Sequence, residues 1–194
     1  MTLGITGGMG CGKSTAAGFF ERRGFRRLDS DRLVRDHVLT SAEVLAALKE
    51  RFGDTIFGVD GAVHRPALAA RVFSDDRERI WLEELTHPLV FALWRHALAA
   101  EPHLQWVLEV PLLFEQALEN WFDFTVCVAC APAQQLARLE QRGLPRELAG
   151  QRISKQLPLA QKIDRSDFVL WNEGSPEFLQ AEVDRLIDTL PVAT

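Results

Sequence analysis

Long apolar runs are missing from this chain of 194 residues. The runs that it has fall well short of the roughly 20 residues that a membrane-spanning helix needs, so we expect no membrane span. It also lacks lysine- and arginine-rich stripes, and its formal net charge is −5, so a nucleic-acid backbone is not an expected partner. The composition, 47% hydrophobic and 25% charged, predicts one compact globular domain with room for an insert.

Cysteine is scarce as well, with three residues at Cys11, Cys127 and Cys130. Such a low, odd count favours reduced thiols. An apolar strand begins almost at the first residue, so we expect no cleaved leader and a cytoplasmic location. Cys127 and Cys130 have the C-x-x-C spacing of a redox or metal pair, but no second Cys or His pair lies near in the sequence to complete a zinc site. Because residues 124–129 resemble a buried strand, the structural interpretation is favoured.

The strongest positive signal is the segment GGMGCGKS at residues 7–14. It fits the pattern G-x-x-x-x-G-K-[ST], with Gly7, Gly12, Lys13 and Ser14 in the fixed places. Residues 3–6 before it suit a buried strand, and residues 14–21 predict the start of a helix. This is the context that the motif requires, and it argues against a chance glycine-rich turn.

Such a loop binds the phosphates of a nucleoside triphosphate, because its glycines let several backbone N–H groups point at one anion. Lys13 can reach the β- and γ-phosphates, and the Ser14 hydroxyl can hold Mg²⁺. The expected phosphate-binding residues are Gly8, Met9, Gly10, Cys11, Gly12, Lys13, Ser14 and Thr15. Cys11 lies near both a helix N-terminus and Lys13, which lower a thiol pKa, so we hypothesise that the activity is sensitive to oxidation.

Alternating strand and helix signals predict an α/β fold with a five-stranded, mainly parallel sheet flanked by helices. Further strands are expected at residues 25–28, 106–110, 124–129 and 168–171. Functional sites in open α/β sheets collect at the carboxyl ends of the strands. The polar residues at those ends are Thr6, Asp29, Asp31, Glu109 and Asn172.

A helical insert is predicted at about residues 33–105, with helices at 42–52, 66–73, 76–85 and 88–100. A crossover between strands normally needs one helix, so the excess is a natural place to recognise a second substrate.

A second helical segment, about residues 138–160, is predicted to be a lid that closes over phosphates and excludes water. Gly143 and Pro145 interrupt it. The basic residues in and around it are Arg138, Arg142, Arg146, Arg152, Lys155 and Lys162. The alternative is a solvated amphipathic helix pair, to which some of these residues must belong. Insert and lid are expected to be parts of one domain over residues 1–194.

Two classes of nucleotide-binding protein lack support in this sequence. A GTPase needs an N-K-x-D guanine motif, which is absent, and a transporter-type ATPase needs its own signature segment and usually a longer domain. A small soluble kinase with an acceptor site and a lid remains.

Six short segments are spread over nearly the whole chain: GITGGMGCGKST at residues 4–15, Asp-Ser-Asp at 29–31, His-Pro at 87–88, PLLFE at 111–115, Gln-Arg at 141–142 and Asn-Glu-Gly at 172–174. Together and in this order, they resemble the dephospho-CoA kinases. The glycine loop alone is unspecific, but the combination is specific. Cys11 stands where the family more usually has Ser, and Ser30 where it usually has Ala.

The resemblance implies a P-loop kinase fold and transfer of the ATP γ-phosphate to the ribose 3′-hydroxyl of dephospho-CoA, which gives CoA and ADP. It implies Asp31 as the carboxylate that orients the acceptor hydroxyl and takes its proton. Lys13, Arg142 and Thr6 are the other expected catalytic residues, and Arg138 and Arg146 could share the role of Arg142. The alternatives are a helix N-cap for Asp31 and a strand-end hydroxyl bonded to backbone for Thr6.

The expected acceptor-binding residues are Asp31, Arg65, His87, Phe114 and Glu115. His87 could instead mark a helix start, and Phe114 could fill the core.

Asn172 is expected on the adenine side of ATP. Mg²⁺ is the expected cofactor, held by Ser14 with Asp29 or Glu109 through water, although a structural role for Glu109 is an equal alternative. ATP and dephospho-CoA are the expected partners of a monomer or weak homo-oligomer.

Two other functions stay open at this point. One is a kinase of the same fold that acts on a nucleoside monophosphate or a shikimate-like alcohol. The other is a nucleotide-binding regulatory module without turnover. The helical insert and residues 111–115 favour a dephospho-CoA kinase over the first, and the presence of both Asp31 and Arg142 argues against the second.

Overall fold

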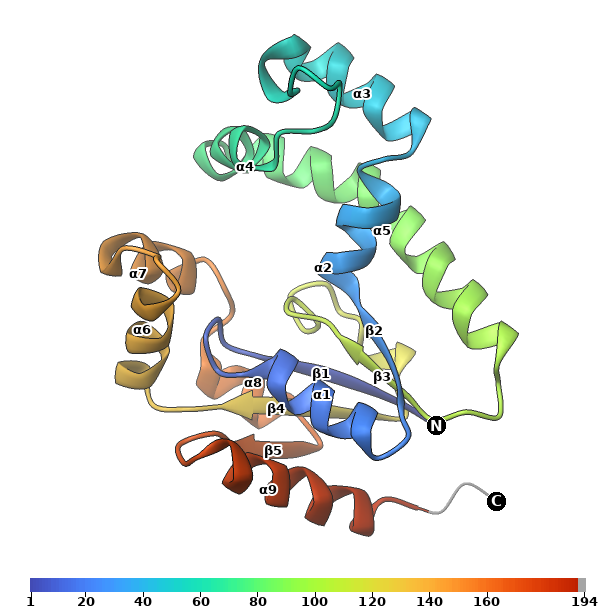
Figure 1. Cartoon of the computed structure of the whole chain (residues 1–194), viewed down its shortest axis with the longest axis vertical. Coiled ribbons are helices and arrows are strands. Elements are labelled where there is room, and N and C mark those ends of the chain that lie inside the picture. The colour runs from blue at the N-terminus through green and yellow to red at the C-terminus, as the bar shows by residue number, and fades with distance from the viewer. Residues whose placement is uncertain (192–194) are drawn as a thin grey trace. The chain divides into compact units, whose positions relative to one another are not determined.

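The computed structural model describes residues 1–191, without the side chain of Phe73. The chain divides into two compact units. One consists of Met1–Asp29 and the chain from His103 onward, and the other is Ser30–Pro102 (Figure 1).

The first unit is built on a five-stranded sheet in the order β2-β3-β1-β4-β5. Its strands are β1 (Thr2–Gly7), β2 (Arg26–Asp29), β3 (Trp106–Glu109), β4 (Phe124–Ala129) and β5 (Phe168–Trp171). Every neighbouring pair is parallel, so the predicted α/β fold is confirmed. The last two strands have the predicted bounds, and the bounds of the first three differ from prediction by one residue.

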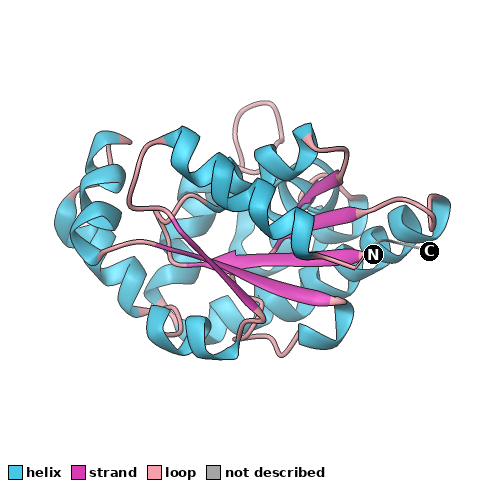
Figure 2. Cartoon of the chain, turned by 90° about the horizontal axis from the view of Figure 1, so that it is seen from below, coloured by secondary structure: helices cyan, strands magenta, loops and turns pink. Residues whose placement is uncertain are grey.

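Helices cover both faces of this sheet, which Figure 2 shows with its strands in magenta. They are α1 (Lys13–Arg22), α6 (Pro132–Gln141), α7 (Arg146–Ser154), α8 (Leu159–Arg165) and α9 (Pro176–Thr189), with the short 3₁₀ helix η3 (Glu119–Trp121). Helices α1 and α9 pack together over one face, and α8 packs against β1 and β4.

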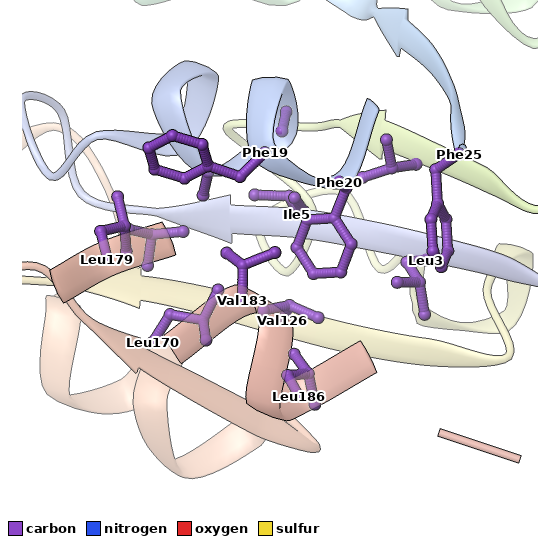
Figure 3. Packing of buried hydrophobic residues seen from close by; sticks show 14 of the residues in the cluster. Leu3, Ile5, Phe19, Phe20, Phe25, Val126, Leu170, Leu179, Val183 and Leu186 are labelled. Atoms are coloured by element: carbon purple, nitrogen blue, oxygen red, sulfur yellow. The ribbon is translucent and has the colours of Figure 1, made fainter. Parts of the chain in front are cut away.

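The main core lies between the sheet and the α1–α9 pair (Figure 3). Phe20 of α1, Val183 of α9 and Ile5 of β1 are fully buried there. Alternate strand residues point to opposite faces, so this core receives Val126 and Val128 of β4 but not Cys127. The glycine loop follows the carboxyl end of β1, the central strand of this sheet.

The second unit is helical over most of its described length. Its elements are α2 (Ser30–Leu33), the π-helical turn η1 (Val34–Val38), α3 (Ala42–Phe52), the 3₁₀ turn η2 (Gly53–Ile56), α4 (Arg65–Ser74) and α5 (Asp76–Ala100). Helix α3 begins where the Ser41 hydroxyl accepts from the Val44 N–H, and it buries Val44 and Leu48.

One prediction here was wrong. Residues 76–85 and 88–100 form the single helix α5, which continues through Pro88. Proline removes one helical N–H and usually interrupts a helix. In α5 the Val90 and Trp94 side chains beyond the proline are buried, and this packing holds the second half in line with the first.

Across residues 1–191, no helix combines the length and the apolar character that crossing a bilayer requires.

Candidate active site

The loop between β1 and α1 has the shape of a phosphate cradle. Gly12 is the N-cap of α1 at φ 98°, and Gly10 lies at φ 81°, both in the left-handed region that favours glycine. A Cβ atom on Gly12 would lie 2.2 Å from Asn172 Nδ2. The chain therefore needs glycine here both for the backbone angle and for the space.

Two cations line one small cavity at this loop. The Lys13 ammonium donates to the carbonyl oxygens of Gly7 and Gly8, each at 3.1 Å. Arg142, exposed at the end of α6, lines the same cavity of about 60 Å³. The complete lining is Gly10, Gly12, Lys13, Ser14, Thr15 and Arg142. A helix N-terminus with an ammonium and a guanidinium is a binding site for an anion such as phosphate.

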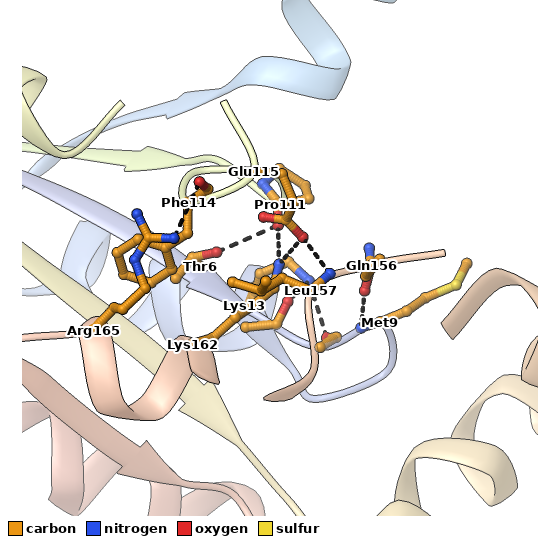
Figure 4. A network of polar contacts seen from close by, with 12 residues as sticks. Thr6, Met9, Lys13, Pro111, Phe114, Glu115, Gln156, Leu157, Lys162 and Arg165 are labelled. Carbon is orange, nitrogen blue, oxygen red and sulfur yellow. Dashed lines mark hydrogen bonds and ion pairs between the residues drawn. The ribbon is translucent and has the colours of Figure 1, made fainter. Parts of the chain in front are cut away.

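Two glutamines that the sequence analysis did not single out hold the loop at Met9. Gln135 of α6 donates its side-chain amide to the Met9 carbonyl at 2.9 Å. The Met9 N–H donates to the Gln156 side-chain oxygen at 3.2 Å (Figure 4). Gln135 lies within α6 and Gln156 in the loop between α7 and α8, and neither position carries a sequence signal of this role.

The end of β5 supports the loop from another side. Asn172 donates its side-chain amide to the Cys11 carbonyl at 2.8 Å. Arg138 in turn donates to the Asn172 backbone carbonyl at 3.0 Å. The structure therefore places Asn172 beneath the loop backbone, and it ties Arg138 to the end of β5.

Thr6 and Glu115 belong to one polar network beside the loop, drawn in Figure 4. The Thr6 hydroxyl donates to the Pro111 carbonyl at 3.3 Å. The Lys162 ammonium donates to the same carbonyl at 2.7 Å and forms an ion pair with Glu115 at 2.8 Å. Glu115 also accepts from the Leu157 N–H at 2.9 Å. Thr6 and Lys162 are fully buried. The network therefore links β1, α8 and the PLLFE segment in the protein interior.

Phe114 fits the core interpretation left open above. It is buried, and the Arg165 guanidinium lies over its ring at 4.7 Å from the centroid. Arg165 also donates to the Phe114 carbonyl at 3.4 Å. The ring therefore fixes the PLLFE segment to α8.

Of the two carboxylates considered for the metal, Glu109 is engaged within the protein. Glu109 is 4% exposed. Its Oε1 atom accepts from Arg27 Nε at 2.7 Å and forms an ion pair with Arg27 Nη2 at 2.5 Å. Asp29 is its register partner across the β2–β3 pair. No cluster of three or more His, Cys, Asp or Glu side chains suited to a metal exists within residues 1–191.

The remaining predicted residues lie in the second unit. Asp31 is exposed in the first turn of α2, and Arg65 is exposed as the first residue of α4. His87 is half-buried in α5, with its ring 5.8 Å from that of Phe91. Burial lowers the pKa of His87 and so favours its neutral ring.

A family model described as dephospho-CoA kinase matches residues 1–177. The chain belongs to this family. A dephospho-CoA kinase from Thermosynechococcus vestitus is 44% identical over 192 residues, which cover 98% of this chain and 95% of that protein. The resemblance inferred from six short segments is thereby confirmed, and the chain is a kinase.

Solved structures show the same fold. A protein from Thermus thermophilus is 34% identical and superposes with a TM-score of 0.85, covering 99% of this chain and 98% of its own. The dephospho-CoA kinase from Campylobacter jejuni is 24% identical with a TM-score of 0.70, covering 96% and 95%, and supports the fold. The family's P-loop kinase architecture thus extends over both units of the chain.

Proposed function

We propose that this kinase transfers the γ-phosphate of ATP to the ribose 3′-hydroxyl of dephospho-CoA, producing CoA and ADP in the last step of coenzyme A biosynthesis. The observation that carries the proposal is the placement of Lys13 and Arg142 around one small cavity at the glycine loop, in a chain of the dephospho-CoA kinase family.

The phosphates of ATP would bind on the N–H groups of residues 8–15, at the N-terminus of α1. Lys13 would leave its two loop carbonyls and contact the β- and γ-phosphates. Arg142 would offer a planar, permanently charged group to the phosphoryl being transferred. The two cations neutralise the charge that otherwise repels an attacking oxygen.

The loop fits Mg²⁺. Ser14 presents a hydroxyl, a hard oxygen ligand, in the cavity lined by Lys13. Mg²⁺ is typically held by one or two protein ligands together with phosphate oxygens and water, which agrees with a site that lacks a carboxylate cluster in residues 1–191. When bound, the ion would neutralise the β- and γ-phosphate oxygens. Asp29 could act on it through water, whereas the pairing of Glu109 with Arg27 favours a structural role for Glu109.

Asp31 is our candidate for the base. It follows Asp29, the last residue of β2, by two positions and is exposed. A carboxylate there can orient the acceptor hydroxyl and accept its proton as the new bond to phosphorus forms.

Residues Arg65 and His87 are proposed to bind the acceptor. Phe114 and Glu115 would act with them by holding the PLLFE segment in place, since both are engaged by α8. Thr6 would serve through the same segment, because its hydroxyl is bonded to Pro111. Asn172 would affect ATP through the loop that it supports. We further infer a cytoplasmic monomer or weak homo-oligomer.

The test is steady-state ADP release with Mg-ATP, with and without dephospho-CoA, and with chromatographic detection of CoA. We expect ADP to form only with the acceptor, in equal amount with CoA, and turnover to stop when EDTA removes the metal. ATP binding without turnover on dephospho-CoA would overturn the proposed substrate and call for nucleotide and small-alcohol acceptors.

A further inference from the structure

The phosphate loop carries a cysteine whose sulfur lies 3.6 Å from that of a second cysteine. Cys11 is in the loop after β1, and Cys130 directly follows β4, 119 residues further along the chain. Both are buried, at 0% and 1% exposure. The parallel pairing of β1 with β4 brings the two together, because Gly7 and Val128 are register partners at the ends of these strands.

The C-x-x-C spacing is misleading here. Cys127 and Cys130 are three residues apart along an extended segment, so their side chains point to opposite faces of the sheet. Cys130 and Cys11 belong to the core under α1 and α9, whereas Cys127 does not. The partner of Cys130 is therefore in the phosphate loop and not on its own strand.

The surroundings of this pair make one sulfur a nucleophile and keep the other protonated. A hydrogen bond donated by the Cys130 thiol, assisted by the charge of Lys13, lowers the pKa of Cys11 to about 7. The same hydrogen bond raises the pKa of Cys130. A thiolate is the form of cysteine that reacts with peroxides, so the lowered pKa favours reaction at Cys11 over Cys130.

We propose that Cys11 and Cys130 form an oxidation site, at which a peroxide creates a disulfide that closes the nucleotide site. The Cys11 thiolate attacks one oxygen of hydrogen peroxide and the O–O bond breaks. Hydroxide departs and takes up a proton to become the first water, and Cys11 becomes a sulfenic acid. The Cys130 sulfur then attacks the Cys11 sulfur as its own proton departs, the S–O bond breaks, and a second water forms. Overall, two thiols and one hydrogen peroxide give one disulfide and two waters.

Formation of the bond displaces the loop. The two sulfurs must approach from 3.6 Å to a bond length of about 2.05 Å. Cys130 directly follows β4, an interior strand of the sheet, so we expect the motion to fall on Cys11, whose N–H donates to Gly8 and whose carbonyl accepts from Asn172. The N–H groups around Cys11 would then no longer converge on the phosphates.

Because Cys11 is fully buried, we infer that peroxide reaches its sulfur when the loop opens beside the phosphate site. Gly10 and Gly12, the two neighbours of Cys11, line the small cavity of the phosphate site. Hydrogen peroxide is close to water in size, and a bound nucleotide would cover this entrance. Bound Mg-ATP is therefore expected to protect the pair.

The decisive experiment treats the protein with hydrogen peroxide, blocks remaining thiols with N-ethylmaleimide after denaturation, and maps peptides by mass spectrometry. We expect a cross-link between the peptides of Cys11 and Cys130, formed more slowly in Mg-ATP. Activity should fall by about tenfold or more and return with dithiothreitol. Free thiols at both positions, or a cross-link that contains Cys127, would overturn the proposal.

Two variants sharpen the test. Cys130→Ala should form no intramolecular disulfide. It should lose activity more slowly than the wild type, because it lacks the hydrogen bond that lowers the pKa of Cys11, although dithiothreitol would still reduce a sulfenic acid at Cys11. Cys127→Ala, the matched control, should behave as the wild type. Reversible inactivation of Cys130→Ala equal to that of wild type would overturn the assignment. The peptide map of the wild-type protein tests the cross-link even if a variant fails to fold.

The consequence for activity rests on the proposed phosphate-binding role of the loop. ATP binding measured by calorimetry before and after oxidation tests the oxidation site separately from the identity of the acceptor. If dephospho-CoA proves not to be the acceptor, the cross-link and the loss of ATP affinity are still expected.

Discussion

The side-chain amide of Asn172 donates to the carbonyl of Cys11 at 2.8 Å, across 161 residues of sequence. Asn172 is buried, and a Cβ on Gly12 would collide with it. The phosphate loop is therefore held by the end of β5 as well as by its own glycines, and this support is open to test.

Asn172→Asp should raise the KM for ATP by about tenfold, because a carboxylate cannot donate to the Cys11 carbonyl and is repelled by it. The value of kcat should change less. Steady-state kinetics at saturating acceptor measures both. Asn120→Asp, on an exposed residue of η3, is the matched control and should be neutral. An unchanged KM in Asn172→Asp would show that the loop keeps its shape without this bond.

Lys13→Ala should lower kcat by about a thousandfold, since it removes the charge next to the transferring phosphoryl group. Lys13→Arg should not restore the rate, because a planar guanidinium cannot occupy the place of a compact ammonium. Lys49→Ala, on an exposed residue of α3, serves as control. Near-normal turnover in Lys13→Ala, with circular dichroism unchanged, would refute the assignment of the nucleotide site.

Asp31→Asn should lower kcat by about a hundredfold or more while ATP affinity stays the same, because the amide cannot take the acceptor proton. The measurement pairs single-turnover kinetics with calorimetric ATP binding. Asp36→Asn is a control from the same segment, since Asp36 pairs at the surface with Arg32 and Arg35. If ATP affinity collapses in a folded Asp31→Asn protein, Asp31 serves the metal instead.

Lys162→Met should reduce the free energy of unfolding by about 3–5 kcal/mol, since it leaves Glu115 without its cation in a buried network. The double variant Lys162→Met with Glu115→Gln should recover part of that loss, because the remaining side chain is uncharged. Urea unfolding of the two single variants and the double variant gives the coupling energy. Additive effects of the two substitutions would mean that the ion pair contributes nothing by itself.

His87 gives the protein a predictable pH dependence. Because burial lowers the pKa of His87 in the folded state, the unfolded chain takes up a proton first as pH falls. Stability is therefore expected to decrease as pH drops below about 6.5, the ordinary histidine value, and to go on decreasing until the folded His87 is also protonated. His87→Gln should reduce this slope in urea unfolding, and His96→Gln, on an exposed residue of the same helix, should not. Equal slopes in wild type and His87→Gln would contradict the expected effect of burial.

The sheet and the phosphate loop could be predicted largely because their sequence signals are local. The motif at residues 7–14 and the apolar strands around it depend on neighbouring residues, and the strands lie within one residue of their predicted bounds. The break predicted at Pro88 was wrong because burial of Val90 and Trp94, which depends on the rest of the unit, overrides a local preference. Lys162 gave no sign of being buried, since a lone lysine on a polar helix usually faces water.

By itself, the sequence determined the phosphate loop, the α/β class and the family, since these are recorded in contiguous segments and their order. Only the tertiary structure decided which distant residues meet at the loop. The loop forms hydrogen bonds with four residues that are distant from it in sequence, Asn172, Gln135, Gln156 and Cys130. Their contacts follow from the register of the parallel strands and the packing of helices on the sheet, which no local pattern encodes.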